Sequence, residues 1–457
     1  MKRLLTLSTA IAALAVTLAV RADAPNVYAI RGARLVTAAG TPIESGTIVV
    51  RRATIEAIGA TVSVPSDADV IDGKGLTVYP GLIDLGNTQV ADQPIPAQPQ
   101  NLRTTAELER WKREQILKPQ VRAADAVKAD DAGMTKLAAA GITSVLAVPS
   151  GDVITGQSAL INVSAPPDEP QIGDIVESRR GLVVMRTPVA LHVSFPNRPR
   201  AGGGAYPESL MGVIAFVRQS FLDAQHYHDA ATHATARRDG ASLSSSDSPP
   251  LEAMQPAVER KLPVAFEANE PREILRALKM ARELKLDPIV TGARGAGEVA
   301  ADLKSQGIRV IYSLNYPVRS RALAPDSDEP ARALRERADA PRVPQTLARA
   351  GVTFAFESAG LADPKDFVRN AAKAVKAGLA EDVAVRALTV GAAAIAGVAD
   401  RVGTIEKGKL ANLIVTDGNL FDEKTTVKRV FVEGRPVVLD ATPLAPAGRG
   451  RGRGSSR

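Results

Sequence analysis

Short segments in which hydrophobic and polar residues alternate stand at both ends of the chain. Residues 27–36 and 47–58 alternate and carry β-branched side chains, with the turn residues 39–42 between them. This pattern is typical of a β-hairpin. Short strand patterns return at 411–417 and 427–438. The sequence therefore predicts β-structure at both ends.

Between the two ends, hydrophobic strand patterns alternate with helical ones. We expect strands at 141–149, 182–193, 262–268, 287–291, 308–314 and 352–358, and helices at 134–140, 271–286 and from residues 299, 344 and 366. Such alternation indicates βα units on a parallel sheet, and the number of units fits an eight-stranded (β/α)8 TIM barrel. A doubly wound open sheet is the alternative, but no Gly-x-Gly-x-x-Gly turn supports it.

Residues 78–90 read Val-Tyr-Pro-Gly-Leu-Ile-Asp-Leu-Gly-Asn-Thr-Gln-Val, an apolar approach and a Pro-Gly turn that leads into a buried strand. This stretch resembles the opening of the first barrel strand in the amidohydrolase superfamily, in its imidazolonepropionase-like exported branch. Residues 403–415, Gly-Thr-Ile-Glu-Lys-Gly-Lys-Leu-Ala-Asn-Leu-Ile-Val, are the most specific match.

The resemblance covers nearly all of residues 27–440 and implies an α/β fold. A TIM barrel over 78–399 would stand beside a split β-sandwich built from 25–77 and 400–440. The stretch 150–157 resembles the loop that follows the second barrel strand in the same branch. Its glycines either let a ligand approach the backbone or only turn the chain.

The first 24 residues have the pattern of a secretory signal. Lys2 and Arg3 precede an apolar run, and Ala22-Asp23-Ala24 has the small-x-small pattern of a cleavage site. We therefore expect a periplasmic or secreted protein with no integral membrane segment after the signal is removed. A retained anchor is less favoured, because Thr and Ser interrupt the run.

The chain has no cysteine, which excludes disulfides and thiolate chemistry. Its net charge is +7, but residues 1–24 carry +2 and the Gly/Arg tail 441–457 carries +4, so the body keeps only +1. A near-neutral body gives no reason to expect a nucleic-acid partner. The tail has the composition of a disordered segment.

The resemblance implies hydrolysis of a carbon–nitrogen bond, in an amide or cyclic amide, by metal-activated water. Its metal-binding histidines would stand at Gly86, Thr88, Glu267 and Gly292, and its metal-binding Asp at Ala359. None of these five positions holds the expected residue, and the fourth-strand ligand has no identifiable counterpart. The sequence therefore predicts a degenerate hydrolase that has no metal ligands and no cofactor.

Only four histidines exist. His226, His228 and His233 lie on a helix predicted to begin near residue 209, and their spacing does not place all three on one face. His192 stands alone on an apolar strand, so we expect it to be a hydrogen-bonded core residue. A metal site elsewhere in the chain is not favoured.

Three carboxylates remain as candidate catalytic residues: Glu267, Glu357 and Asp84. Side chains alternate along a strand, so Glu267 shares a face with Ala265, and Glu357 with Ala355. The two glutamates could act as an acid and a base without a metal. In the alternative they form a polar plug, each paired to an arginine such as Arg294, while Asp84 holds only the strand-end backbone.

Three functions therefore stay open. The first is a degenerate amidohydrolase that acts as a partner subunit, in a homo-oligomer or with an active paralogue. The second is a metal-independent hydrolase. The third is a non-catalytic protein that binds a small-molecule ligand.

Overall fold

The computed structural model describes residues 27–91, 96–127, 131–163, 177–179, 182–201, 203–236, 248–324 and 326–439. Within these ranges the chain is an α/β fold with one eight-stranded, one six-stranded and one five-stranded sheet. The expected signal segment 1–24 and the Gly/Arg tail 441–457 lie outside the described residues.

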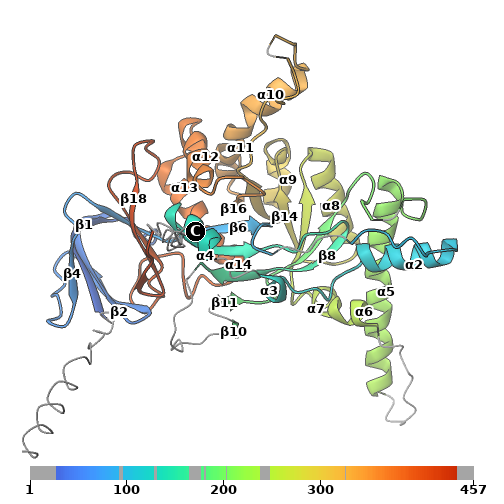
Figure 1. The fold of residues 1–457 in the computed structure, drawn as a ribbon, viewed down its shortest axis with the longest axis horizontal. Coiled ribbons are helices and arrows are strands. Elements are labelled where there is room, and N and C mark those ends of the chain that lie inside the picture. Colours follow the sequence, from blue (N-terminus) through green and yellow to red (C-terminus); the bar gives the residue numbers. More distant parts are fainter. Residues whose placement is uncertain are drawn as a thin grey trace, which may run out of the picture.

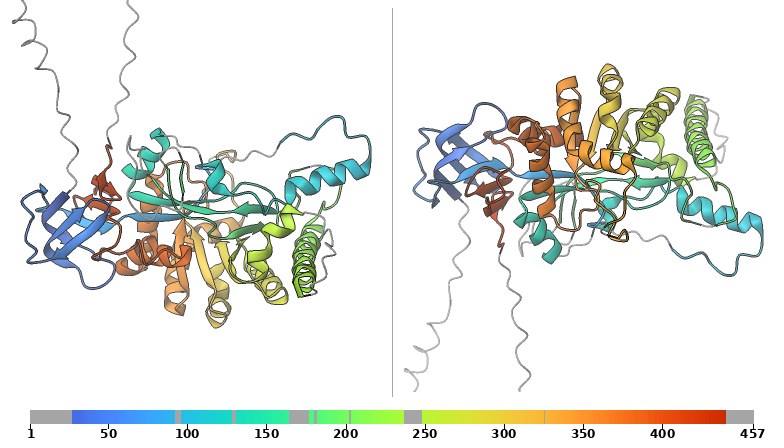
Figure 2. Two further views of the ribbon diagram at one scale, coloured as in Figure 1. Left: turned by 90° about the horizontal axis from the view of Figure 1, so that it is seen from below. Right: turned by 90° about the horizontal axis from the view of Figure 1, so that it is seen from above.

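The two ends of the chain meet in the eight-stranded sheet, at one end of the molecule (Figures 1 and 2). β5 pairs antiparallel with β17, which places Pro80 opposite Leu413. The strand order is β19-β18-β17-β5-β1-β2-β3, with β4 on β1. The bounds are β1 (Val27–Leu35), β2 (Ile43–Arg51), β3 (Thr54–Gly59), β4 (Asp69–Asp72), β5 (Thr77–Pro80), β17 (Leu413–Thr416), β18 (Val427–Val432) and β19 (Arg435–Pro436).

The middle of the molecule holds the other two sheets, with orders β10-β11-β9-β7-β6 and β16-β15-β14-β13-β12-β8. β6 and β7 are parallel neighbours, as are β12 to β16 in succession. The bounds are β6 (Leu82–Asn87), β7 (Ile142–Ala147), β8 (Ile154–Gln157), β9 (Ala159–Asn162), β10 (Glu177–Arg179), β11 (Leu182–Arg186), β12 (Leu191–Ser194), β13 (Val264–Ala268), β14 (Pro288–Gly292), β15 (Arg309–Ser313) and β16 (Thr353–Glu357).

The parallel strands do not form the regular eightfold repeat that the sequence predicts. β8 pairs antiparallel with β12, and β9 pairs antiparallel with β7, so each of the two sheets contains an antiparallel strand that the sequence did not predict. Among the described strands, pairing does not close the two sheets into one barrel. The Ala359 N–H, just after β16, nevertheless donates to the Gly86 carbonyl of β6 (3.0 Å).

Two local predictions are corrected here. Residues 154–157 form a strand and not part of a loop. Within this strand, Gly156 has φ +129°, and a Cβ there would collide with the Val121 carbonyl oxygen. The expected strand 182–193 is two strands, β11 and β12, with Pro188 between them. Proline has no N–H to donate, which disfavours a continuous ladder there.

Helices cover the central sheets (Figure 1). α8 begins with Pro271 at its first turn, as expected, because proline fixes the φ angle that a first turn needs. The bounds are α2 (Thr105–Ile116), α3 (Ala123–Ala126), α4 (Asp131–Ala139), α5 (Leu210–Ala236), α6 (Pro249–Ala253), α7 (Gln255–Val258), α8 (Pro271–Glu283), α9 (Ala300–Ser305), α10 (Ala331–Asp339), α11 (Val343–Ala350), α12 (Lys365–Lys376), α13 (Glu381–Leu388) and α14 (Val390–Ala396), with 3-10 turns Ala296–Val299 and Ala340–Arg342. Across the described ranges, no helix combines the length and apolar character needed to span a membrane.

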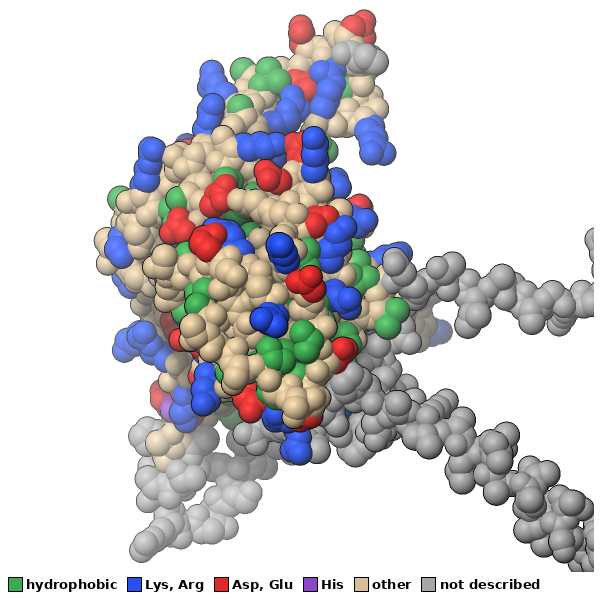
Figure 3. Space-filling model, turned by 90° about the vertical axis from the view of Figure 1, so that its left-hand side faces the viewer, with side chains coloured by type: hydrophobic (Ala, Val, Ile, Leu, Met, Phe, Trp, Pro, Cys, Tyr) green, Lys and Arg blue, Asp and Glu red, His purple; other side chains and the backbone are tan. Residues whose placement is uncertain are grey.

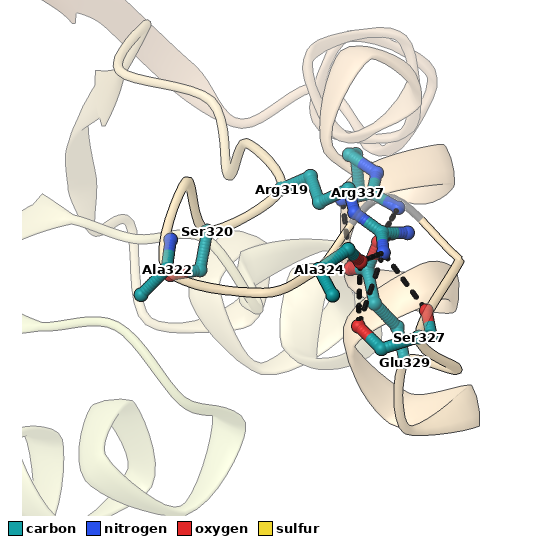
Figure 4. A network of polar contacts seen from close by, with 7 residues as sticks. All are labelled: Arg319, Ser320, Ala322, Ala324, Ser327, Glu329 and Arg337. Atoms are coloured by element: carbon teal, nitrogen blue, oxygen red, sulfur yellow. Dashed lines mark hydrogen bonds and ion pairs between the residues drawn. The ribbon is translucent and has the colours of Figure 1, made fainter.

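The loop before α10 is held by an ion-pair network (Figure 4). The Glu329 carboxylate, whose side chain is 6% exposed, accepts from Arg319 (3.0 Å) and from Arg337 of α10 (2.9 Å). Arg319 also donates to the Ser327 carbonyl (2.8 Å). On the face seen in Figure 3, basic and acidic side chains are interspersed.

Candidate functional site

A cavity of about 360 Å³ lies at the ends of the central strands. Ligand sites of α/β folds commonly form outside the carboxyl ends of parallel strands. An apolar cluster that includes Ala265, Ile289, Ile311 and Ala355 lies deeper between the same strands. The cavity is lined by Gly86, Thr88, Val148, Pro149, Ser150, Gly151, Thr155, His192, Val193, Ser194, Arg200, Glu267, Thr291, Glu357 and Ala359.

Glu357 ends β16 and is buried in the cavity wall. Its Oε1 accepts from the Gly292 N–H at 2.9 Å. Burial raises the pKa of the Glu357 carboxyl well above its ordinary value near 4.5, and the neighbouring Glu267 and Asp84 carboxyls raise this pKa further. A carboxyl in such surroundings takes up a proton more readily than one in water.

Glu267, on β13, reaches solvent at the same cavity. Burial against neighbouring protein atoms raises the pKa of its carboxyl, Glu273 adds to the rise, and the charges of Arg294 and Arg200 oppose it. The two glutamates therefore meet in one cavity, with Ala265 and Ala355 below them, as strand alternation predicts.

Asp84 is fully buried and joins two strand ends. Its Oδ1 accepts from the backbone N–H groups of Gly86 (3.1 Å) and Ser358 (2.8 Å), and its Oδ2 accepts from the Asn87 side chain (3.3 Å). Asp84 does not line the cavity. This geometry matches the alternative in which Asp84 holds the backbone of β6 against the end of β16.

The described residues do not show the polar plug in which each glutamate would pair with an arginine such as Arg294. In the described part of the chain, no ion pair joins Arg294 to Glu267 or Glu357, and the Arg294 Nε is buried without a hydrogen-bond partner. Arg200, which the sequence did not single out, lines the cavity instead. It donates to Asp152 (3.0 Å) and to the Gly151 carbonyl (2.8 Å), so its charge is already paired.

His192, on β12, differs from its prediction as a hydrogen-bonded core residue. The residue is 7% exposed, and its Nε2 is buried without a hydrogen-bond partner. Burial lowers the pKa of the imidazole to about 4, so it is neutral at neutral pH. The prediction was wrong because the ring lines the cavity, where no protein group reaches Nε2. Nothing in the sequence around His192 indicates that its ring lines a cavity.

The other histidines do not complete a site. His226 and His228 lie on α5 and do not line the cavity, and His228 contacts Glu259 at 3.6 Å. The side chain of His233 lies outside the described residues. Nowhere in the described ranges do three or more His, Cys, Asp or Glu side chains stand in an arrangement that could hold a metal ion.

Other side chains fill the space at two expected histidine positions. A Cβ at Gly86 would collide with the carboxyl of Glu357 and lie 2.7 Å from its Cβ. A Cβ at Gly292, whose φ is +76°, would lie 2.5 Å from the Asn269 Oδ1. A histidine at position 86 or 292 therefore does not fit unless Glu357 or Asn269 moves.

The raised pKa of Glu357 predicts a pH-dependent stability. A group whose pKa is higher in the folded state binds more protons there, so its contribution to stability falls as pH rises from about 4.5 toward the raised pKa. Glu357→Gln, always neutral, keeps an oxygen for the Gly292 N–H. We expect the difference in unfolding free energy, variant minus wild type, to grow with pH by up to about 1.4 kcal/mol per unit.

Urea unfolding between pH 4.5 and 9 measures this difference. His192 has a lowered pKa, which makes stability rise with pH between about 4 and 6.5. That effect is common to both proteins and cancels in the difference. A difference that stays constant with pH would contradict a raised pKa for Glu357.

Comparisons with known proteins agree with this fold. The model of the amidohydrolase family matches residues 258–437. The structure of an amidohydrolase from Thermotoga maritima is similar with a TM-score of 0.72 at 22% identity, and the match covers 90% of this chain and 99% of that one. No curated protein matches the sequence.

Two further structures are similar at lower scores. One is a prolidase in complex with N-methylphosphonate-L-proline, with TM-score 0.51, 19% identity, and coverage of 90% of this chain and 99% of that one. The other is molinate hydrolase, with a TM-score of 0.52 and 14% identity. The match covers 95% of this chain and 99% of that one. Residues 258–437 thus match the amidohydrolase family, and the chain has the fold of amidohydrolase structures, whose architecture is a TIM barrel with a β-sandwich.

Proposed function

We propose that this protein is an exported amidohydrolase of the imidazolonepropionase-like branch that has lost the metal mechanism and binds a small molecule in the cavity between Glu267, Glu357 and His192. The observation that carries this proposal is that the Glu357 carboxyl stands where a histidine at Gly86 would need to be. The cavity, at about 360 Å³, is within the range of small-molecule sites.

Several features support binding as the function. The cavity is open to solvent at Glu267 and contains polar groups that converge from β12, β13 and β16. A convergent set of polar groups in a preformed cavity orients a ligand even where no reaction follows. The neighbouring structures are hydrolases by name, which makes a small amide or cyclic amide the first class to test.

Hydrolysis without a metal is the second candidate, and the unequal surroundings of the two glutamates favour it. Glu357 is buried while Glu267 reaches solvent, a difference that separates an acid from a base. Glu267 would take a proton from the water that attacks the amide carbon, and Glu357 would give one to the departing nitrogen. Release of amine from a bound amide, lost in both Glu267→Gln and Glu357→Gln, would support this candidate.

Metal analysis tests the main proposal. We expect untagged protein, purified from the exporting host, to contain far less than one equivalent of zinc, iron or manganese by mass spectrometry. Incubation with each ion followed by gel filtration should leave the content low, because the described cavity lacks a set of three ligands. A chelator should leave the melting temperature unchanged.

Glu267→Gln serves as the control in the same experiment. If the wild type retains a trace of metal and the variant does not, the trace is bound through this carboxylate. One equivalent of metal that survives gel filtration would contradict the proposal, because ligands would then exist that this arrangement does not provide.

A further inference from the structure

The cavity is lined by more acidic than basic side chains. Glu267 and Glu357 line it, and the Asp84 carboxyl, which does not line it, is close enough to raise the pKa of Glu357. Arg200 is the one lysine or arginine among the lining residues of the described chain, and it is bonded to the Asp152 carboxylate. Among the described residues, no lysine or arginine therefore forms an ion pair with Glu267 or Glu357.

Arg294 does not take this role. It contributes to the charge around both glutamates, but it lines the neighbouring groove beside α8 and α10 and not the cavity. Carboxylates that share a small site without a counter-ion repel one another. A ligand that brings positive charge would relieve that repulsion.

His192 gives a second, independent indication of a ligand. Its Nε2 is buried, has no hydrogen-bond partner, and belongs to a ring that lines the same cavity. Buried polar atoms in folded proteins are nearly always hydrogen-bonded, so this nitrogen lacks a partner that a ligand can supply. A neutral imidazole nitrogen can accept a hydrogen bond from an N–H group.

We propose that the cavity selects an organic cation, an ammonium, amidinium or guanidinium group held by Glu267, Glu357 and His192. This inference rests on the proposed function, since it assumes a cavity without a metal ion. N–H groups on a cation donate charge-assisted hydrogen bonds to carboxylates, which are among the stronger hydrogen bonds in proteins. In the tautomer that carries its proton on Nδ1, the His192 Nε2 is an acceptor with which such an N–H group can pair.

Three probes of one shape test the choice of charge: benzamidine, which is a cation at neutral pH, benzamide, which is neutral, and benzoate, which is an anion. Isothermal titration calorimetry on the full chain should show benzamidine binding about tenfold or more tightly than benzamide, with benzoate weakest. Glu267→Gln should weaken benzamidine binding by about tenfold and remove the preference for it over benzamide.

Two further variants make the result specific. Glu109→Gln removes one negative charge from an exposed position on α2 and should leave all three affinities unchanged. His192→Phe fills the space of the imidazole without an acceptor and should weaken benzamidine severalfold. His192→Gln, which keeps an oxygen acceptor, should weaken it less and serves if the Phe variant does not fold.

Several outcomes would overturn the inference. These are equal or tighter binding of benzamide, tightest binding of benzoate, no binding of any probe, or no effect of Glu267→Gln. Metal analysis separates this failure from failure of the proposed function. Metal-free protein that prefers benzamide contradicts only the choice of a cation, whereas one equivalent of bound metal contradicts the proposed function itself.

Discussion

Replacing Gly86 by histidine is expected to destabilise the protein and not to restore a metal site. A Cβ at this position would lie 2.7 Å from the Cβ of Glu357, and one oxygen of the Glu357 carboxyl would be closer still. Glu357 cannot move away freely, because it is buried and accepts from the Gly292 N–H. Overpacking of a buried site costs about 1–3 kcal/mol, which urea unfolding measures.

The double variant Gly86→His, Glu357→Ala tests the cause. Removing the Glu357 side chain frees the space for the imidazole, so the two changes should not add, with a coupling of about 1 kcal/mol or more. Thr88→His is the matched control, because Thr88 is exposed at the same cavity and should accept a histidine within about 0.5 kcal/mol. Additive effects in the double variant would show that Glu357 does not exclude histidine from position 86.

Asp84→Ala is expected to cost about 3–5 kcal/mol of unfolding free energy. The aspartate accepts three hydrogen bonds inside the protein, from Gly86, Asn87 and Ser358. Alanine would leave these donors buried without partners, and each such donor costs about 1–3 kcal/mol. The bond to Ser358 links β6 to the end of β16, so its loss would also loosen the wall that carries Glu357.

Asp84→Asn separates the hydrogen bonds from the charge. The amide oxygen can still accept from the Gly86 and Ser358 N–H groups, so we expect this variant to lose less than half as much stability as alanine. Unfolding in urea at neutral pH gives both values. Equal losses for Asn and Ala would show that the carboxylate charge, and not the three hydrogen bonds, is what the fold requires.

Local patterns in the sequence predicted most of the elements around the site. Alternation along 264–268 predicts that Ala265 and Glu267 share one face of the strand. In the structure Glu267 lines the cavity, and Ala265 lies in the apolar cluster beneath it. Pro271 correctly indicated the start of α8. The antiparallel segment 154–162 was missed, because strand direction depends on which neighbours a strand meets and not on its own pattern.

The sequence by itself determined that glycine stands at positions 86 and 292, where the resemblance implies histidine. Only the tertiary structure decided what stands in their place. Glu357 comes to Gly86 from the far end of the chain, and His192 is left without a partner because no distant residue reaches its Nε2. Short-range periodicity encodes the direction in which a side chain points, whereas contacts between residues distant in sequence depend on how the elements pack together.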